Sequence, residues 1–377
     1  MIKRKLEIKK IHSLMEEFPV TAILGPRQCG KTTLAALLSY DYFFDLENPR
    51  DLAKFENPQL LLEDLKGLIV IDEIQRKPGL FPLLRYLVDK NKKQKYLILG
   101  SASPDLIKKS SESLAGRISY FELGGFTPLD VGKDGFRDLW MKGGFPRSFL
   151  ASNYGKSGLW LENYISSFLE RDIPQFGIKI PGGVLRKFWM ILSAYHGQIV
   201  NYSEIGRIFG MSDMTVRRYI DILSETFTVR VLQPWHNNTK KRLVKNPKIY
   251  IRDSGIFHYF SGINNYIQLA GSPKIGFSWE GFAIEQVLRI LNKNSHRIFF
   301  WKTHAGAELD LFWQDKNKNW GVEFKYNDAP TTTKSMLSAV SDLNLEHLWV
   351  IYAGKDIYRL SSKITVIPLY DFMLKFI

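Results

Sequence analysis

The sequence predicts an α/β protein with more than one domain, and two patterns carry this prediction. Short apolar strands alternate with helices through about residue 125, which is typical of a parallel sheet covered by helices on both faces. Farther along, after residue 275, the order is a helix, three strands, a second helix and another strand. A length of 377 residues also favours two or three domains.

The first buried strand, at 20–24, leads directly into a phosphate-binding sequence. The stretch GPRQCGKT at 25–32 has the spacing G-x-x-x-x-G-K-T, and a helix follows at 33–38. Loop amides and the helix N-terminus point at phosphate oxygens, and the glycines permit close approach. We expect Lys31 to reach the β- and γ-phosphates and Thr32 to bind Mg²⁺. The predicted nucleotide-binding set is Gly25, Pro26, Gln28, Gly30, Lys31, Thr32 and Thr33.

Polar residues end the next two apolar strands. LIVIDEIQ places Asp72 to hold Mg²⁺ through water and Glu73 to polarise the attacking water, although an acid pair can also simply cap a strand end. YLILGSAS ends in Ser101 and Ser103, and Ser101 is placed to sense the γ-phosphate. Serine also starts helices as an N-cap, so this second role stays open.

A single arginine and a helical segment follow the predicted nucleotide-binding core. Arg117 in SLAGRISYFEL is a candidate for stabilising transition-state charge, in its own or a neighbouring subunit, or else a surface salt-bridge partner. The stretch 140–169 predicts helices interrupted at GGFPR. Pro174, after Glu-Arg-Asp at 170–172, predicts the end of this helical lid.

The middle of the chain has the pattern of a helix-turn-helix. Ile205, Ile208 and Phe209 fit one helix face, GMS is a tight turn, and Ser212 or Asp213 would cap the next helix. Val216, Ile220 and Leu223 give that second helix its apolar stripe. Its two arginines, Arg217 and Arg218, are expected to face outward, where they would contact nucleic acid.

Two strands, FTVRVLQPW and PKIYIRD, follow and enclose a basic wing. Residues 240–252 contain six basic residues and no acid: Lys240, Lys241, Arg242, Lys245, Lys248 and Arg252. Such cations release counterions from a phosphate backbone, so Lys240, Lys241, Arg242 and Lys245 join the predicted nucleic-acid-binding set. Winged helices also mediate protein contacts, and a basic wing can be a plain solvated hairpin.

The last segment predicts a second site. The helix SWEGFAIEQVLRILNK carries Glu280 in its first turn, Asp310 lies in the second strand, and Glu323 and Lys325 share one face of the third strand. Metal-dependent phosphodiester cleavage needs carboxylates around one Mg²⁺ and a lysine that positions or activates water. We therefore expect Glu280, Asp310 and Glu323 as metal ligands and Asp310, Glu323 and Lys325 as catalytic residues. The alternatives are a simple Glu–Lys strand pair or a nuclease-like fold without activity.

Composition limits the partners. The formal net charge of +14 favours a polyanion such as nucleic acid, although it is also compatible with solubility charge alone. Cys29 is the only cysteine, so no intrachain disulfide forms, which fits a reducing cytoplasm. The N-terminal sequence lacks a signal-peptide core, and no apolar run is long enough to span a bilayer.

The matching stretches follow one order along nearly the whole chain: GPRQCGKTTL, IDEIQ, GSAS, LAGR, GGFPR, ERD, TVRRYIDIL, PKIYIRDSG, WEGF, AELD and VEFK. In these stretches the sequence resembles the bacterial and archaeal AAA-type ATPases with a C-terminal domain of unknown function. The resemblance implies a P-loop AAA-type core at 1–125, a helical lid at 126–182, a winged helix at 183–262 and a restriction-endonuclease-like α/β domain of the PD-(D/E)XK type at 263–377. It implies ATP and Mg²⁺ as cofactors.

Two functions remain open on the sequence alone. The first is an ATP-dependent protein that binds and processes DNA. The second is an ATP-driven signalling switch whose winged helix and inactive nuclease-like domain bind protein. A homo-oligomer is expected if Arg117 acts in a neighbouring subunit, and no membrane partner is expected.

Overall fold

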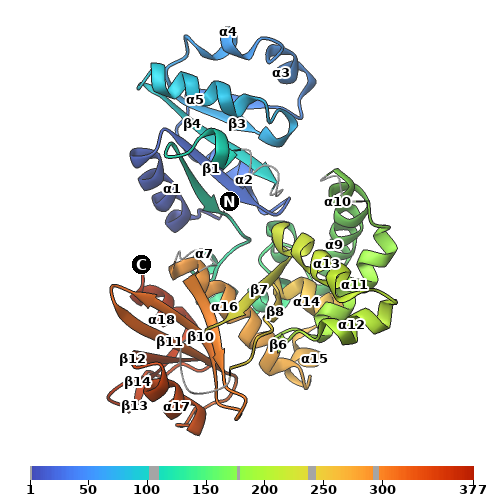
Figure 1. Ribbon diagram of the computed structural model, residues 1–377, viewed down its shortest axis with the longest axis vertical. Coiled ribbons are helices and arrows are strands. Elements are labelled where there is room, and N and C mark those ends of the chain that lie inside the picture. Colours follow the sequence, from blue (N-terminus) through green and yellow to red (C-terminus); the bar gives the residue numbers. More distant parts are fainter. Residues whose placement is uncertain (1, 102–109, 176–178, 237–242, 292–296) are drawn as a thin grey trace. The chain divides into compact units, whose positions relative to one another are not determined.

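The computed structural model describes residues 2–101, 110–175, 179–236, 243–291 and 297–377. Its contacts divide them into two compact units, each with its own sheet (Figure 1). Unit 1 contains residues up to 126, with 145–147 and 225–227, and unit 2 contains 127–144, 148–224 and 228–377. Apart from residue 126 and the short stretches 145–147 and 225–227, the segments expected as lid, winged helix and nuclease-like domain belong to unit 2, and the finer division remains a prediction.

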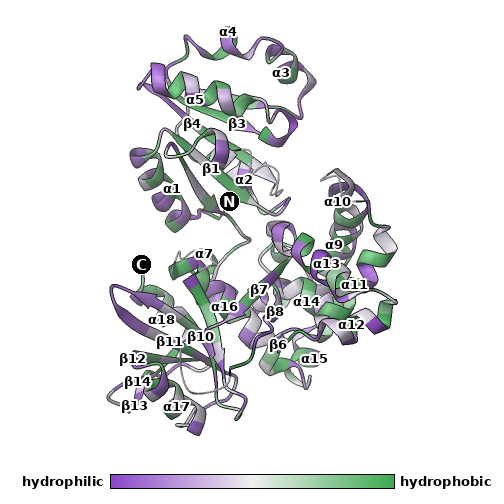
Figure 2. Cartoon of the chain, viewed as in Figure 1, coloured by the Kyte–Doolittle hydropathy of each residue, from purple (hydrophilic) through white to green (hydrophobic). Residues whose placement is uncertain are grey.

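Unit 1 is a parallel five-stranded sheet with strand order β2-β3-β4-β1-β5, as the alternation of strands and helices predicted. The strands, coloured mainly as hydrophobic in Figure 2, are β1 (Val20–Gly25), β2 (Tyr42–Asp45), β3 (Gly67–Asp72), β4 (Gln94–Ser101) and β5 (Ile118–Glu122). The helices are α1 (Lys5–Glu17), α2 (Lys31–Ala35), α3 (Pro49–Lys54), α4 (Pro58–Leu62), the 3₁₀ turn η1 (Ile74–Arg76) and α5 (Leu80–Lys90).

The core of unit 1 explains why the strands are continuously apolar. Every residue of β1 is buried, and β3 and β4 are buried over most of their length. Strands buried on both faces lose the alternation of half-exposed strands. Because all neighbours are parallel, the ends of β1, β3 and β4 lie at one edge of the sheet, where the site residues follow.

Unit 2 contains a mixed nine-stranded sheet with order β13-β14-β12-β11-β10-β9-β7-β8-β6. The strands are β6 (Gln198–Ile199), β7 (Val229–Pro234), β8 (Lys248–Ile251), β9 (Ile298–Lys302), β10 (Glu308–Asp315), β11 (Lys318–Lys325), β12 (Leu345–Tyr352), β13 (Tyr358–Ser361) and β14 (Ile364–Pro368). The order expected after residue 275 is present: helix, β9, β10, β11, helix, β12. Strand β11 is antiparallel to β10 and parallel to β12.

The helices of unit 2 begin with the expected helical segment. They are α7 (Pro128–Lys142), α8 (Pro146–Phe149), α9 (Tyr154–Ser167), the π-helical turn η2 (Phe168–Asp172), α10 (Ile173–Gln175), α11 (Gly182–Ala194), α12 (Tyr202–Phe209), α13 (Asp213–Glu225), α14 (Ser254–Phe260), α15 (Tyr266–Ala270), α16 (Ile275–Leu291), α17 (Lys334–Asp342) and α18 (Leu369–Lys375). The described helical run continues through Pro174 to Gln175, the last described residue before the gap at 176–178.

The helix-turn-helix elements are present, with glycines at both close approaches. A side chain at Gly206 would lie 2.6 Å from the Met211 carbonyl oxygen, so glycine lets α12 meet the turn. Gly210 ends α12 with a left-handed φ of 64°. Of the three residues expected on the buried face of α12, Ile208 is 58% exposed, so its assignment to that face is wrong.

The two strands expected as a wing do not form an isolated hairpin. Strand β7 pairs with β8 on one side and runs parallel to β9 on the other, through Gln233 with Phe299 and Pro234 with Phe300. The sheet is therefore continuous from the helix-turn-helix segment into the C-terminal segment.

The two glycines of GGFPR, Gly143 and Gly144, meet the RDSG motif in unit 2. Asp253 accepts hydrogen bonds from the backbone amides of Gly144, at 2.8 Å, and Ile256, at 3.1 Å. A side chain at Gly143 would collide with this carboxylate at 2.1 Å, and one at Gly255 would meet the Lys142 carbonyl oxygen at 2.3 Å. Both glycines thus permit the contact between the end of α7 and the start of α14.

Candidate functional site

The phosphate-binding loop of unit 1 has the backbone that its sequence predicted. A side chain at Gly25 would lie 2.1 Å from the Leu123 carbonyl oxygen, and Gly30 has a left-handed φ of 99° just before α2. Gln28 also has a positive φ, of 61°. The Lys31 ammonium donates to the carbonyl oxygens of Gly25 and Pro26, both at 3.0 Å. The loop is thus curled around its own lysine at the N-terminus of α2.

The predicted magnesium ligands lie side by side. The Thr32 hydroxyl donates to Asp72 Oδ2 at 2.6 Å, and the Glu73 amide donates to Asp72 Oδ1 at 2.8 Å. Burial raises the pKa of Asp72 above its ordinary value, although the Thr32 hydrogen bond opposes the shift. Burial, and then the neighbouring Asp72, raise the pKa of Glu73. Glu73 has a left-handed φ of 54° and accepts from the Gln75 side chain.

Ser101 lies directly beside the loop. It is the register partner of Gly25 across β1 and β4, and only 2% of it is exposed. Its hydroxyl has no hydrogen-bond partner within the described part of the chain. A buried, unpaired hydroxyl is costly, which favours a ligand atom at this position. Thr33 is exposed on α2, and Ser103 lies outside the described residues.

The structure separates Arg117 from this loop. Arg117 precedes β5 beside Val20, the first residue of β1, whereas the loop follows the last residue of β1. The length of that strand corresponds to roughly 16 Å. The guanidinium forms a two-pronged salt bridge with Asp89, at 2.7 and 2.9 Å. Arg117 therefore does not reach its own chain's loop, and a role in a neighbouring subunit remains a prediction.

These residues fit Mg²⁺ and a nucleotide. A hydroxyl and a carboxylate within hydrogen-bond distance are the oxygen ligands that Mg²⁺ prefers, directly or through water. The unpaired Ser101 hydroxyl and the loop's glycine-lined backbone suit phosphate oxygens. Thr32 and Asp72 would hold the metal ion, and Lys31 would leave the loop carbonyls for phosphate.

The second predicted site forms a cluster in unit 2. Asp310 lies on β10, Glu323 and Lys325 lie on β11, and Glu280 lies on α16, in its second turn because this helix begins at Ile275. The Lys325 ammonium donates to Glu323 Oε1 at 2.7 Å. Asp310 Oδ2 accepts from the Phe324 amide at 3.0 Å. The structure thus brings all four predicted residues together.

A lysine that was expected on the wing lies inside this cluster. Lys248, on β8, is 3% exposed, and its ammonium lies 3.2 Å from Glu280 Oε1, 3.2 Å from Asp310 Oδ1 and 2.5 Å from Glu308 Oε1. Tyr250, two residues along the strand, donates to Glu280 Oε1 at 2.6 Å. The expectation that Lys248 contacts a phosphate backbone is therefore wrong, because its charge is already neutralised internally.

The protonation states reflect this crowding of carboxylates. Burial, and then the Asp310 charge, raise the pKa of Glu280 to about 7 and that of Glu323 to about 8. The pKa of Lys248 lies well above its usual value, because the surrounding carboxylates outweigh the cost of burial. One Glu323 oxygen, Oε2, has no hydrogen-bond partner among the described residues.

A second buried ion pair joins the same elements. Glu285 of α16 accepts from the Arg230 guanidinium of β7 and, at 3.1 Å, from Arg252, which follows β8. These arginines hold the pKa of Glu285 at about 2 in spite of burial. Arg252, like Lys248, was expected to contact phosphate from the wing and instead neutralises an internal acid.

The cluster in unit 2 does not fit the predicted metal site. Over the residues that the structure describes, no group of three or more His, Cys, Asp or Glu side chains could hold a metal ion. The oxygens of Asp310 and one oxygen of Glu280 already have protein donors. Lys248 supplies the positive charge that a divalent cation would bring.

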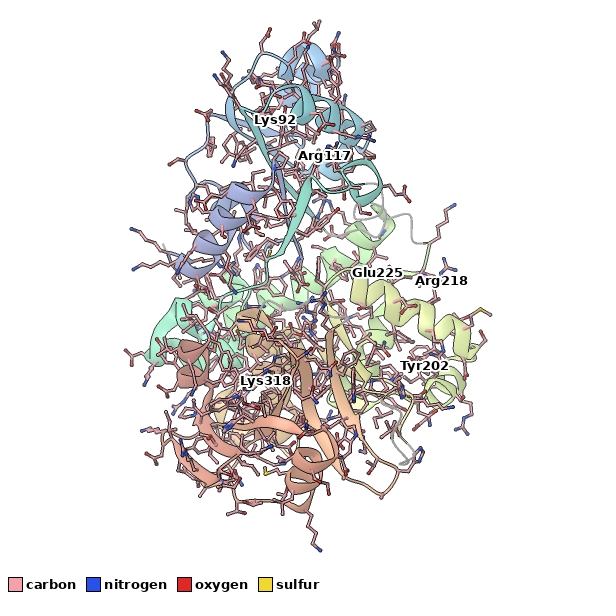
Figure 3. The ribbon with its side chains drawn as sticks, turned by 60° about the vertical axis from the view of Figure 1, so that its left-hand side comes forward. Lys92, Arg117, Tyr202, Arg218, Glu225 and Lys318 are labelled. Atoms are coloured by element: carbon pink, nitrogen blue, oxygen red, sulfur yellow. The ribbon has the colours of Figure 1, made fainter. Side chains whose placement is uncertain are left out.

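The predicted nucleic-acid contacts are only partly described. Arg217 and Arg218 are exposed on α13, Lys245 is exposed, and Lys240, Lys241 and Arg242 lie outside the described residues. The Arg217 guanidinium stacks 3.7 Å from the centre of the Tyr202 ring, whereas Arg218 points away from the helix (Figure 3). Within the described chain, no helix is both long and apolar enough to cross a membrane.

Sequence reasoning missed Lys248, Tyr250 and Glu308 as members of the cluster. A signal was present in KIYIR, where polar and apolar residues alternate, so that Lys248, Tyr250 and Arg252 share one face of a strand. When one face of a strand carries three polar side chains and the other face is apolar, the polar face is expected to contact polar groups elsewhere in the fold.

Comparison with known proteins gives three family matches. Residues 17–129 match an AAA domain, residues 133–266 match a domain of unknown function (DUF8612), and residues 275–372 match another (DUF4143). Uncharacterized proteins of Mycobacterium tuberculosis and Mycobacterium bovis are each 42% identical over 372 residues, covering 98% of this chain and 84% of theirs. A solved Walker-type ATPase of Pyrococcus abyssi is a distant likeness, with 16% identity, a TM-score of 0.45, and coverage of 69% of this chain and 96% of its own.

Proposed function

The chain belongs to the family of these uncharacterized mycobacterial proteins, with an AAA domain followed by two domains of unknown function, and we propose that it binds ATP with Mg²⁺ and hydrolyses it. The observation that carries the proposal is the meeting of Lys31, Thr32 and Asp72 at one sheet edge beside the unpaired Ser101 hydroxyl. Mg²⁺, when bound, supplies charge neutralisation to the phosphates.

Each residue has a role that follows from its position. Lys31 would exchange the Gly25 and Pro26 carbonyl oxygens for phosphate oxygens. Glu73 is next to Asp72 and has a raised pKa, so it would orient the attacking water and accept its proton. Ser101 would donate its hydroxyl to the terminal phosphate. These roles make the loop a site for hydrolysis as well as for binding.

The direct test is ATP turnover by Lys31→Ala. Removing one positioned cation from a charge-stabilising site is expected to lower turnover by about 10²–10³-fold. Lys92→Ala is the matched control, because Lys92 is exposed and lies two residues before the start of β4, at the end of that strand opposite to Ser101 (Figure 3). Turnover by Lys31→Ala equal to that of Lys92→Ala would refute the ATPase proposal.

A second function, DNA binding, is favoured by the paired arginines on α13. The order α12, α13, β7, β8 supports a likeness to winged helices, and the order α16 to β12 supports the likeness to PD-(D/E)XK nuclease folds. Arg217 and Arg218 are exposed next to each other on the second helix of the helix-turn-helix, the helix that enters the major groove in such motifs.

DNA binding is tested by fluorescence anisotropy with a labelled duplex over a range of salt concentrations. The double variant Arg217→Ala/Arg218→Ala is expected to bind more weakly and to reduce the salt slope by about 0.9 for each lost phosphate contact. Lys318→Ala/Lys363→Ala removes two exposed positive charges elsewhere and serves as the control. Equal binding by both double variants would assign α13 to another partner and favour the signalling switch.

A further inference from the structure

Lys248 is the centre of the charge network in unit 2. Its ammonium contacts Glu280, Asp310 and Glu308, which come from a helix and a strand that follow it in the chain. Lys302 also bonds to Glu308, at 2.6 Å, and Lys325 bonds to Glu323. The cluster therefore contains four carboxyl groups and three ammonium groups among the described side chains. A single proton on one carboxyl would leave it neutral without any added ion.

Most carboxylate oxygens around Lys248 already accept hydrogen bonds from protein groups. One oxygen of Asp310 accepts from the Lys248 ammonium, and the other accepts from the Phe324 amide. Glu280 Oε1 accepts hydrogen bonds from both the Lys248 ammonium and the Tyr250 hydroxyl. Among the carboxylates of this cluster, only Glu323 has a buried oxygen without a hydrogen-bond partner in the described chain. The other Glu323 oxygen, Oε1, accepts from the Lys325 ammonium at 2.7 Å.

A divalent cation and Lys248 would compete for the same oxygens. A metal bound by Glu280 and Asp310 would lie within a few ångström of the ammonium. In a buried environment, like charges at such distances repel strongly. The ammonium is also tethered to β8, which is paired on both sides, with β7 and β6, so it cannot leave without disturbing that strand.

We propose that Lys248 is the resident cation of this cluster and occupies the position that its convergent carboxylates would otherwise give to a divalent metal ion. The native cluster therefore takes no Mg²⁺ or Mn²⁺ and cuts no DNA. Removal of the Lys248 ammonium uncovers a single site for a hard divalent cation, formed by Glu280, Asp310 and Glu323. The inference concerns unit 2 alone and does not depend on ATP hydrolysis in unit 1.

The test is Mn²⁺ binding by the full-length chain without nucleotide, followed by electron paramagnetic resonance. All proteins carry Asp72→Asn, which removes the metal-binding carboxylate of the phosphate-binding loop. The Asp72→Asn parent is expected to show no bound Mn²⁺ that depends on Asp310. Adding Lys248→Ala is expected to create one Mn²⁺ site per chain and to tighten binding by at least about tenfold. Adding Asp310→Asn as well is expected to abolish that site.

Two results would overturn the proposal. One is a Mn²⁺ site in the parent that Asp310→Asn or Glu323→Gln removes, together with Mg²⁺-dependent DNA cleavage that the same substitution removes. The other is a folded Lys248→Ala protein that gains no site. Lys248→Met keeps the length of the side chain and replaces the alanine variant if that protein does not fold. The measurement on the parent tests the proposal even without either variant, and ATP turnover of the native chain is assayed separately.

Discussion

Both units place a buried or nearly buried lysine beside acidic residues, yet the two lysines are used differently. Among the described residues, the Lys31 ammonium donates to two backbone carbonyl oxygens, and Asp72 beside it is paired with a hydroxyl. Lys248 reaches three carboxylates directly. Lys31 can exchange its carbonyl partners for a ligand at little cost in free energy. Lys248 neutralises buried carboxylates, so losing its contacts would destabilise the fold. Residue type alone therefore does not separate a binding site from an internal charge network.

Among the substitutions that test this comparison, the largest change, a loss of ATP turnover, is expected at Glu73. Glu73→Gln keeps the size and hydrogen bonding of the side chain but removes the base, so ATP turnover should fall by about 10²–10⁴-fold. Nucleotide binding, measured with a fluorescent ATP analogue, should persist. Glu346→Gln, a change at an exposed glutamate of unit 2, is the control. Unchanged turnover in Glu73→Gln would mean that the carboxylates of unit 1 are structural too.

The next effect compares the two lysines directly by their contribution to stability. Lys248→Met leaves Glu280 and Asp310 buried without their counter-charge, and breaking a buried pair costs about 3–5 kcal/mol. Lys31→Met in the absence of nucleotide should change stability by less than about 1 kcal/mol, since its partners are loop carbonyls. Calorimetric unfolding of each variant measures both. Similar stability losses for the two variants would break the comparison.

The smallest effect is a difference in acid sensitivity between the units. His196 and His258 are buried in unit 2, and burial lowers their pKa values to about 3 and about 4. His196 Nδ1 accepts from the Ile251 amide at 2.9 Å, so Nε2 carries the proton toward the Phe277 carbonyl oxygen. The unfolded chain binds protons below its ordinary histidine pKa while the folded unit does not. Stability should therefore fall as pH decreases below about 6.5.

At pH 5 each of these histidines should cost unit 2 about 2 kcal/mol of unfolding free energy relative to pH 7.5. Denaturant titrations at the two pH values measure the loss. His258→Gln removes one titrating group, so its loss between the two pH values should be smaller than that of the native chain. An identical pH dependence in the variant would contradict the assignment.

The order of elements was largely predictable because it rests on local patterns. The strand, loop and helix around Lys31 lie within about twenty residues, and the spacing of glycines fixes the backbone there. The pairing of β7 with β9 was not predictable. It joins Gln233 to Phe299, which are far apart in the sequence, and hydrophobic periodicity reports only on local structure. The wing was therefore expected as a separate hairpin.

The same distinction applies to the sites. The four predicted residues of the unit 2 cluster do converge, because strand periodicity places Glu323 and Lys325 on one face. Lys248 comes from a strand 62 residues before Asp310, and a basic run in sequence gave it the wrong partner. The glycine of WEGF, Gly281, could not be explained from the sequence either. A side chain there would lie 2.0 Å from His196 Nε2, and this contact with a distant residue is visible only in the fold.

The continuity of the nine-stranded sheet has a consequence for any shortened version of this chain. Cleavage after residue 262, the end of the segment that looks like a winged helix, would strip β7 of its neighbour β9 and expose a free strand edge that invites aggregation. It would also leave Arg230, Lys248 and Arg252 without the acids of α16 and β10. The helix-turn-helix and the last third of the chain are therefore expected to be inherited, expressed and degraded together.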